Sequence, residues 1–225
     1  MLKIAILGGK GGITKSTYAR ALGVSLAKRQ YDVIGFDTDG DQASFWRWNE
    51  RRKKHHPDLI NFPVVTGSNP VTIRKQIADR SAAMAGKKQA AVIDGAAYAS
   101  KTVIQLAEIA DLVVLPTRYS VDDMESAYRI YQELTQAGIP SHRIAIAFSG
   151  VSESKREHRE AASTFEDAGI YVIPGYIPQL TSYSTAQDKG LSVCEVQNQP
   201  RLFTLARWMI DATIDRALEV EELNK

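Results

Sequence analysis

Short apolar runs alternate with longer amphipathic stretches along most of the chain. The short runs are rich in β-branched residues and predict strands at 2–7, 32–36, 62–67, 90–94, 112–117, 143–149 and 171–177. The longer stretches predict helices at 16–29, 43–54, 70–84, 101–109, 121–137, 153–167 and about 200–222. Because the short runs are almost entirely apolar, we expect both faces of the strands to be covered. This alternation is typical of an α/β fold with a mostly parallel, doubly wound sheet flanked by helices.

The last predicted helix carries one apolar stripe, which we expect to pack against the core. The stripe consists of Leu202, Leu205, Met209 and Ala212. No repeat, low-complexity tract or linker interrupts the chain, so we expect residues 1–225 to form a single domain.

The composition is that of an ordinary soluble globular protein, with 44% hydrophobic and 24% charged residues among 225. No segment reaches the roughly 18 apolar residues needed to cross a bilayer, and residues 1–7 do not resemble a signal peptide. The single cysteine, Cys194, fits a reducing cytoplasm and is expected to be a buried thiol. The four histidines lack metal-ligand spacing, so no structural zinc is expected.

The segment GGKGGITKST, residues 8–17, lies between the first predicted strand and the first predicted helix. It is close to the phosphate-binding pattern G-x-x-x-x-G-K-[ST], but Thr14 replaces the glycine before the lysine. Unsatisfied N–H groups at a helix start bind phosphate, Lys15 would neutralise it, and the Ser16 hydroxyl would ligate Mg²⁺. The alternative is a glycine-rich turn that binds no ligand.

A second lysine, Lys10, gives the pattern K-G-G-x-x-K-S-T. This pattern resembles the altered phosphate loop, K-G-G-x-G-K-[ST]-T, of the ParA/MinD family of P-loop ATPases. The resemblance is nearest to small ParA-like plasmid partition ATPases. It implies a P-loop NTPase fold, ATP and Mg²⁺ as cofactors, and a homodimer in the ATP state in which Lys10 reaches the phosphates of the other subunit.

Two acidic strand ends extend the resemblance. The segment FDTDGDQAS, residues 36–44, resembles the family's D-x-D-P-Q-G stretch, which implies that Asp37 holds a magnesium-bound water and Asp39 orients the attacking water. An acidic turn that caps the next helix is the alternative. Asp94 in AVIDGAA matches the Walker B aspartate, which implies a place in the magnesium shell. The family usually continues with T-P-P, which residues 95–97 replace.

Residues 176–193 resemble the I-P segment through which the family packs against adenine. The resemblance therefore implies three sets of site residues. The catalytic residues are Lys10, Lys15 and Asp39, and the metal-binding residues are Ser16, Asp37 and Asp94. The cofactor-binding residues are Gly11, Gly12, Ile13, Thr14, Lys15, Ser16, Thr17, Ile177, Pro178 and Gln179.

Thr14 allows two outcomes. A β-branched residue in a left-handed conformation costs on the order of 1 to 3 kcal/mol, which would weaken nucleotide binding or slow turnover. With a negative φ, its hydroxyl could instead donate a hydrogen bond to a phosphate. We expect a slow but competent ATPase, and we expect Thr14→Gly to increase turnover or affinity.

The distribution of charge along the chain indicates whether DNA or a membrane is the expected partner. Residues 46–56 carry a formal +4 with two tryptophans interleaved, a pattern that suits sequence-independent DNA binding. Packing of Trp46 below a solvated face is the alternative. Residues 200–225 have a formal balance of −1, so no membrane attachment is expected.

The resemblance implies an ATP-dependent dimerisation switch that partitions plasmid or chromosomal DNA with a ParB-like or centromere-binding adaptor. It would act on the nucleoid in the bacterial cytoplasm. Three alternatives stay open: positioning of a non-DNA cargo such as a protein compartment or a conjugation complex, a recruitment module with negligible hydrolysis, and a metabolic ligase.

Overall fold

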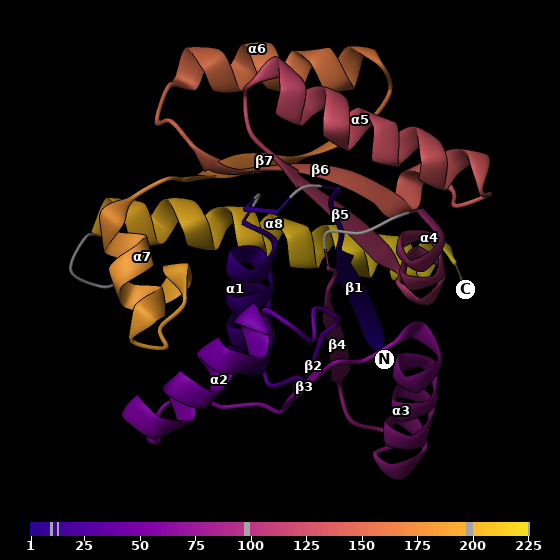
Figure 1. The fold of residues 1–225 in the computed structure, drawn as a ribbon, viewed down its shortest axis with the longest axis vertical. Coiled ribbons are helices and arrows are strands. Elements are labelled where there is room, and N and C mark those ends of the chain that lie inside the picture. The colour runs from indigo at the N-terminus through magenta and orange to yellow at the C-terminus, as the bar shows by residue number, and fades with distance from the viewer. Residues whose placement is uncertain (10, 13, 97–99, 197–199, 225) are drawn as a thin grey trace.

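A twisted β-sheet runs through the centre of the protein (Figure 1). The computed structural model describes all residues except 10, 13, 97–99, 197–199 and 225. In these described residues the sheet has seven strands, in the order β3-β2-β4-β1-β5-β6-β7. They are β1 (Leu2–Ile6), β2 (Asp32–Asp37), β3 (Val64–Thr66), β4 (Gln89–Asp94), β5 (Leu112–Thr117), β6 (Ile144–Val151) and β7 (Tyr171–Pro178). Every pairing is parallel, which confirms the predicted fold class.

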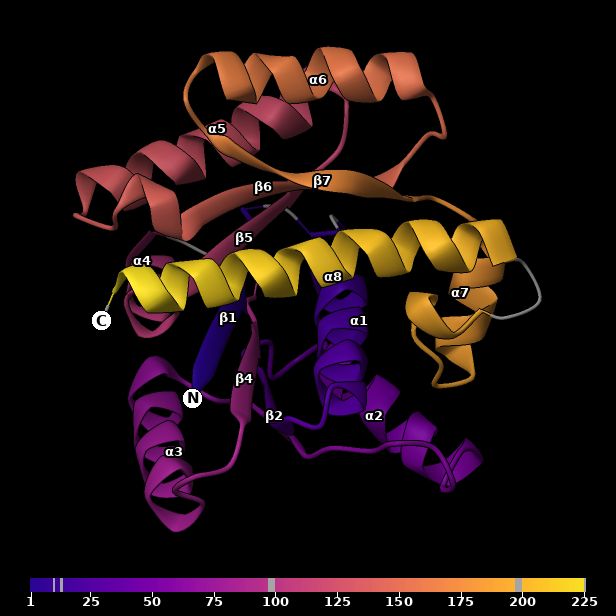
Figure 2. The same cartoon turned by 180° about the vertical axis from the view of Figure 1, so that it is seen from behind.

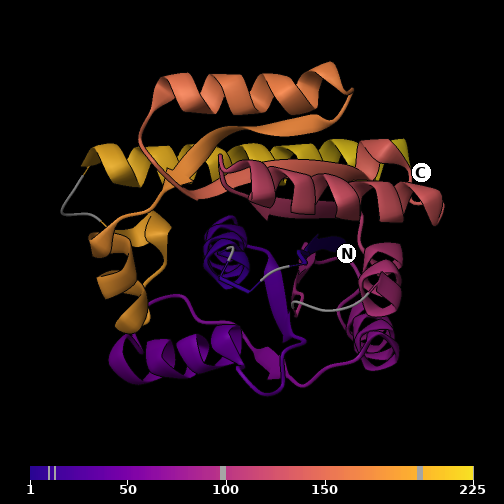
Figure 3. The same ribbon diagram turned by 45° about the horizontal axis from the view of Figure 1, so that its top comes forward.

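Helices cover both faces of the sheet, as the apolar strands predict. They are α1 (Lys15–Lys28), α2 (Ser44–His55), α3 (Pro70–Ala83), α4 (Ser100–Ile109), α5 (Val121–Gln136), α6 (Lys155–Asp167), α7 (Thr181–Asp188) and α8 (Pro200–Leu223). One apolar core holds buried residues of α1, α2, α7 and α8, and the other holds those of α3, α4, α5 and α6. Figure 2 shows α8 lying along its face of the sheet, and Figure 3 shows α5 and α6 on the opposite side.

The strand register brings acidic residues together at one edge of the sheet. Asp37 pairs with Asp94 at the ends of β2 and β4, and Ile6 at the end of β1 is also level with Asp94. The loop that leads from β1 into α1 therefore starts beside both aspartates. In open parallel sheets, ligands bind outside the carboxyl ends of the strands, and this edge is the one that carries the motifs.

The element boundaries follow the local chemistry. Helix α6 begins at Lys155, two residues later than predicted, because Ser154 caps it by accepting the backbone N–H of Glu157 at 3.2 Å. Strand β6 begins at Ile144, because residues 141–143 form a short 3₁₀ helix. Helix α7 was not predicted, since its sequence TSYSTAQD is short and mostly polar.

The apolar stripe of α8 differs from the prediction. Met209 is fully buried as expected, but Leu205 and Ala212 are only partly buried. The buried side of the described part of the helix instead consists of Ala206, Met209, Ile210, Thr213, Ile214, Ala217 and Val220. Thr213 is polar but can be buried here because its hydroxyl is hydrogen-bonded. It lies 2.5 Å from the Tyr18 hydroxyl and donates to the carbonyl of Met209. Cys194 is buried, as predicted.

Candidate functional site

A cavity of about 300 Å³ lies at the carboxyl edge of the sheet, where β1, β2 and β4 end. It brings together all of the described residues that the motifs predicted for phosphate and metal. Its lining consists of Gly11, Gly12, Thr14, Lys15, Ser16, Thr17, Arg20, Asp37, Asp39, Gln42, Ser44, Asp94, Gly95 and Ala96. Lys10 and Ile13 were also predicted for this site, and both lie outside the described residues.

Thr14 has the left-handed backbone that the first of the two outcomes required. Its φ is 55° and its ψ is 17°, and it stands directly before the first helical residue, Lys15. Its hydroxyl is buried and has no hydrogen-bond partner among the described residues. Its methyl group packs on Gly150, where an added Cβ would lie only 2.7 Å from it. The loop therefore keeps the helix-start geometry at the expense of backbone strain.

The guanidinium of Arg118 holds the loop from the other side. Its Nη2 donates a hydrogen bond of 2.8 Å to the carbonyl oxygen of Gly12. Arg118 follows β5, the strand that neighbours β1, so the contact joins segments more than 100 residues apart. Arg118 carries no sequence signal of this contact, because no local pattern links it to the loop.

Lys15 lies in the first turn of α1 and is 9% exposed. Burial lowers the pKa of its ammonium, and the carboxylates of Asp94 and Asp39 partly offset that effect. An ammonium group enclosed in this way has little water to compete with an anionic ligand. The position suits neutralisation of a phosphate group.

Asp37 holds the start of α2 as well as facing the cavity. One of its carboxylate oxygens accepts the backbone N–H groups of Phe45 and Trp46 at 2.8 and 3.0 Å, and the other accepts that of Asp39 at 3.1 Å. The residue at the N-cap position, Ala43, has no side-chain acceptor, so Asp37 caps the helix from a distance. Asp39 in turn accepts the backbone N–H of Gln42 at 2.9 Å. The capping alternative therefore describes real contacts of both aspartates.

Asp94 is the most perturbed carboxyl group of the cavity. Burial raises its pKa to about 7, the Ser16 hydroxyl bonded to it opposes that rise, and Asp37 adds to it. Its Oδ1 is buried without a hydrogen-bond partner in the described part of the chain. Such a site fits a bound cation, which would favour the ionised carboxylate and satisfy that oxygen.

Thr38 connects the two acidic strand ends. Its hydroxyl donates to the carbonyl oxygen of Asp94 at 3.1 Å and accepts the backbone N–H of Ala96 at 2.7 Å. The backbone N–H of Gly95 donates to the carbonyl of Ile6 at 2.9 Å. Residues 95 and 96, which replace the first two residues of T-P-P, are thereby fixed to β1 and to the segment after β2. Ala97 lies outside the described residues.

No group of three or more His, Cys, Asp or Glu side chains that could hold a metal occurs among the described residues. Asp94, Asp37 and Ser16 line the cavity with carboxylate and hydroxyl oxygens, the kind of oxygen that Mg²⁺ prefers.

A smaller cavity of about 130 Å³ adjoins the first and shares Thr14 and Thr17 with it. The three residues predicted to contact a base, Ile177, Pro178 and Gln179, all line this smaller cavity. Ile177 is 1% exposed, while Gln179 is exposed and is held by its backbone N–H on the carbonyl of Val151 at 2.8 Å. The residues predicted for phosphate and those predicted for the base therefore line two adjoining cavities.

The basic segment of α2 is only partly a surface. Arg52 is fully buried, and its guanidinium binds the Glu195 carboxylate through two hydrogen bonds of 2.8 and 2.9 Å. Burial alone would raise the pKa of Glu195, but the hydrogen bonds and charge of Arg52 bring it below its ordinary value. Arg52 therefore does not belong to a DNA-binding surface. Trp46 is partly buried against the core, as the packing alternative predicted.

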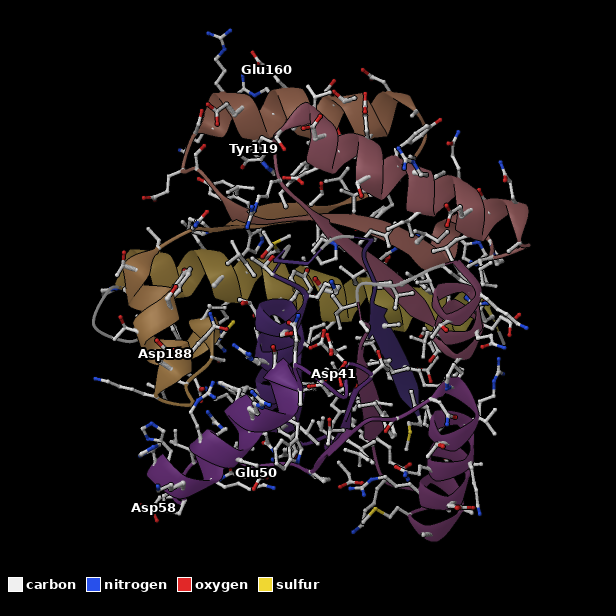
Figure 4. The ribbon with its side chains drawn as sticks, viewed as in Figure 1. Asp41, Glu50, Asp58, Tyr119, Glu160 and Asp188 are labelled. Atoms are coloured by element: carbon white, nitrogen blue, oxygen red, sulfur yellow. The ribbon has the colours of Figure 1, made fainter. Side chains whose placement is uncertain are left out.

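A larger and more apolar cavity lies elsewhere. It has a volume of about 590 Å³ between α5 and α6, and Tyr119 and Glu160, labelled in Figure 4, line it. Its lining contains neither the phosphate loop nor the acidic strand ends. Chemistry, not volume, therefore identifies the candidate site.

The loop between β1 and α1, with Lys15 at the helix start and aspartates at the neighbouring strand ends, places the protein in the class of P-loop nucleotide-binding proteins. Within that class the chain belongs to the CobQ/CobB/MinD/ParA nucleotide-binding domain family, whose sequence model matches residues 4–193. It is an ATPase of the ParA/MinD type, which confirms the resemblance drawn from the motifs.

The relatives agree with this assignment. A protein for maintenance of carboxysome distribution from Gloeobacter kilaueensis is 25% identical over 192 residues, which cover 85% of this chain and 83% of that protein. The structure of the MinD cell division protein of Aquifex aeolicus has a TM-score of 0.73 at 15% identity and covers 96% of this chain and 98% of its own. Apo McdA from Cyanothece has a TM-score of 0.71 at 18% identity, with coverages of 95% and 99%.

Across the described residues, every helix is too short or too polar to span a membrane.

Proposed function

We propose that this ATPase is a slow, ATP-dependent dimerisation switch that positions a large cargo in the bacterial cytoplasm. The observation that carries the proposal is the cavity lined by Lys15, Ser16, Asp37 and Asp94, beside a smaller cavity lined by Ile177, Pro178 and Gln179. A switch needs a site that distinguishes ATP from ADP, and charged groups placed around the terminal phosphate supply that distinction.

The roles of the residues follow from their positions. The backbone of Gly11, Gly12 and the first turn of α1 would bind the phosphates, and Lys15 would neutralise their charge. Ser16, Asp37 and Asp94 would hold Mg²⁺, whose contribution is to neutralise charge that develops on the phosphates. Thr14 and Thr17 lie between the two cavities. Ile177, Pro178 and Gln179 would contact the base.

Asp39 is proposed to orient the attacking water and accept its proton. Its Oδ1 already accepts the N–H of Gln42, and its backbone N–H is held by Asp37. The carboxylate is thus fixed at the mouth of the cavity, which suits a positioning role. Asp39→Ala should retain ATP binding and lose hydrolysis; a variant that hydrolyses ATP at the rate of the unaltered protein would remove this role.

Dimerisation is proposed from the ParA/MinD resemblance of Lys10. An ATP-bound homodimer would form when Lys10 reaches the nucleotide of the partner subunit, and it would separate after hydrolysis. Sedimentation of the protein with ATP, with ADP and with Lys10→Ala tests this. We expect a dimer only for the unaltered chain with ATP or a slowly hydrolysed analogue.

Two cargoes are candidates. Plasmid or chromosomal DNA, bound through a ParB-like or centromere-binding adaptor, follows from the ParA-like motifs. A protein compartment is favoured by the relative named for carboxysome distribution, which matches most of this chain. The two differ in a genetic test: loss of the ATPase should raise plasmid loss per generation in the first case, and should cluster a fluorescent compartment without plasmid loss in the second.

Either cargo is proposed to be carried over the nucleoid by nonspecific DNA binding. Without the buried Arg52, the exposed basic residues of α2 are Arg47, Lys53 and Lys54, and Lys53 is paired with Glu50 at 2.7 Å. Figure 4 shows Glu50 on α2 and Asp58 beyond its end. This surface is therefore less positive than the sequence alone indicated, and the proposal of DNA contact rests on only three exposed side chains.

Mobility shifts of nonspecific DNA with ATP, ADP and a slowly hydrolysed analogue test nucleoid binding. Lys53→Glu with Lys54→Glu should weaken retention by ATP-bound protein and reduce its salt dependence. Lys155→Glu with Arg159→Glu on α6 is the matched control, since it makes the same charge change on a different exposed helix. If no nucleotide state retains DNA even at low salt, nucleoid-based positioning is abandoned.

A further inference from the structure

Arg20 lies one turn beyond the phosphate loop on α1 and lines the cavity, yet no motif assigned it a role. Its Nη1 donates to Oε1 of Gln187 at 2.7 Å, and its Nη2 donates to the carbonyl oxygen of Ser44 at 2.7 Å. Its Nε is enclosed and has no partner among the described residues. One guanidinium thus connects α1 with both α2 and α7.

The contact with Ser44 leads to the aspartates. Ser44 is the first residue of α2, and the next two backbone N–H groups of this helix are bound by the Asp37 carboxylate. The other oxygen of that carboxylate holds the backbone N–H of Asp39. Arg20 therefore fixes the far end of a short segment whose conformation places Asp37 and Asp39 in the cavity.

The contact with Gln187 leads to the base side. Gln187 belongs to α7 and lines the smaller cavity together with Ile177, Pro178 and Gln179. Its side chain is 9% exposed, so its orientation is restricted by packing. A group bound in the smaller cavity would contact the same helix that Arg20 holds.

Arginine suits this position better than lysine. Its planar fork carries two donors at a fixed spacing, while an ammonium group is a point charge that bonds well to one acceptor at a time. Burial lowers the pKa of Arg20 to about 10, with the charges of Asp94 and Asp37 opposing that effect, so it stays charged at neutral pH. Both bonds are consequently charge-assisted.

We propose that Arg20 is a positioning residue that couples the base-side helix α7 to the segment carrying Asp37 and Asp39. This inference rests on the nucleotide site proposed above, and it deepens that proposal by assigning a route between its two halves. Arg20 makes its bonds to protein groups on either side of the cleft, so its loss should misplace Asp39 while leaving the phosphate and base contacts in place. We therefore expect the loss of Arg20 to lower kcat and to leave KM for ATP nearly unchanged.

The test is a double-mutant cycle on ATP hydrolysis by the full chain. Arg20→Lys retains the charge and loses the fork, and Gln187→Leu removes the acceptor on α7. We expect each change to lower kcat by about 10-fold, within the range for small misplacements of reacting groups, with KM for ATP altered less than about threefold. The double variant should be no slower than the slower single variant, because both changes break the same bridge.

The matched control is Arg29→Lys, at the residue that follows the end of the same helix. Arg29 also bridges two acceptors, Asp211 at 2.9 Å and Asp215 at 3.0 Å, but these lie on α8 and not at the cleft. Arg29→Lys should leave kcat and KM unchanged. A melting temperature for each variant shows whether the fold is retained.

Several results would overturn the coupling role. A rise in KM with kcat unchanged would make Arg20 a direct ligand of the phosphates. Additive losses in the double variant, or losses that only parallel a fall in melting temperature, would make it an independent or purely structural residue. The outcome is separable from the proposed positioning function, because hydrolysis by purified protein needs neither DNA nor cargo. If the double-mutant cycle gave the expected result but no nucleotide state retained DNA, only the proposed nucleoid-based positioning would be abandoned.

Discussion

The two halves of the candidate nucleotide cleft are built from different kinds of chemistry. The phosphate half collects charged groups from the ends of β2 and β4 and the start of α1, and Lys15, Asp37 and Asp94 in it are nearly buried. The base half is formed by β7 and α7 and contains Ile177, Pro178 and Gln179. Buried charge is unfavourable unless a ligand or partner compensates it. The lining of the base half is otherwise uncharged, and its Arg118 is only partly buried and already donates to the carbonyl of Gly12. The phosphate half therefore depends on its ligand far more than the base half does.

The largest effect should come from the cation of the phosphate half. Lys15→Ala removes the only described lysine that lines this cavity, so we expect kcat/KM for ATP to fall by at least about 100-fold. Steady-state hydrolysis measures it. The matched control, Lys75→Ala, removes an exposed lysine from α3 and should change nothing. Equal effects of the two changes would show that the phosphate half does not bind the nucleotide as described.

Asp94→Asn should separate stability from activity. Burial raises the pKa of this carboxyl from 3.8 to about 7, which corresponds to at most about 4 kcal/mol. The folded chain holds this proton to higher pH than the unfolded chain does. Stability of the ligand-free protein is therefore greatest below pH 4 for this group, and it falls as the pH rises toward 7.

Asparagine cannot ionise, so Asp94→Asn removes the free-energy cost of burying a carboxylate. At pH 8 without nucleotide or Mg²⁺ we therefore expect this variant to have a melting temperature several degrees higher. Hydrolysis should be lost, because the neutral amide binds a cation poorly. The gain in melting temperature should shrink at pH 5 and disappear below about pH 4, where Asp94 is protonated in both the folded and the unfolded chain. A gain as large at pH 4 as at pH 8 would contradict an origin in ionisation and weaken the contrast between the two halves.

Thr14→Gly should have a moderate effect, since it relieves the left-handed backbone at φ 55° without changing charge. We expect turnover or ATP affinity to rise by about three- to tenfold, because part of a strain of roughly 1 to 3 kcal/mol is released. Thr14→Ala is the control: it removes the hydroxyl and the methyl contact with Gly150 but keeps the Cβ. A gain in Thr14→Ala as large as in Thr14→Gly would assign the effect to side-chain crowding instead of backbone strain.

The base half should give the smallest effect. Gln179→Ala removes one exposed side chain, whose net hydrogen-bond contribution of about 1 kcal/mol predicts a rise in KM for ATP of roughly fivefold or less. The affinity for inorganic pyrophosphate should stay the same, since that ligand has no base. Calorimetric titration with both ligands measures this. A loss of pyrophosphate binding would show that the two halves are not separable.

The same contrast explains what could be predicted from the sequence. Lys15, Asp37 and Asp94 stand directly at strand or helix ends, so an ordered pattern of strands places them at one edge of the sheet. Periodicity also gave all the strands within a few residues. Arg118 and Arg20 were missed because their partners, Gly12, Ser44 and Gln187, are brought near only by the folded chain. Helix α7 was missed for a related reason, since its short polar sequence has no apolar period of its own.

Charge counting failed at α2 because it cannot see burial. The formal +4 of residues 46–56 included Arg52, which the structure assigns to an ion pair in the core. A sum of formal charges takes no account of which helix face a residue occupies. Arg52 lies on the same buried face of α2 as Phe45 and Trp48, and it pairs with Glu195, more than 140 residues away.

The buried pair of Arg52 and Glu195 also separates the basic residues of α2 into two groups. Arg52 is needed by the fold, while the exposed basic residues can change during evolution without affecting it. Arg52 further donates to the carbonyl oxygens of Ile60 and Gly190, at 3.0 and 3.1 Å, so a substitution there would disturb three segments at once. Exchange of Arg47, Lys53 or Lys54 touches none of these contacts. A protein of this kind could therefore strengthen or weaken its attraction to an anionic polymer over many generations while its architecture stays unchanged.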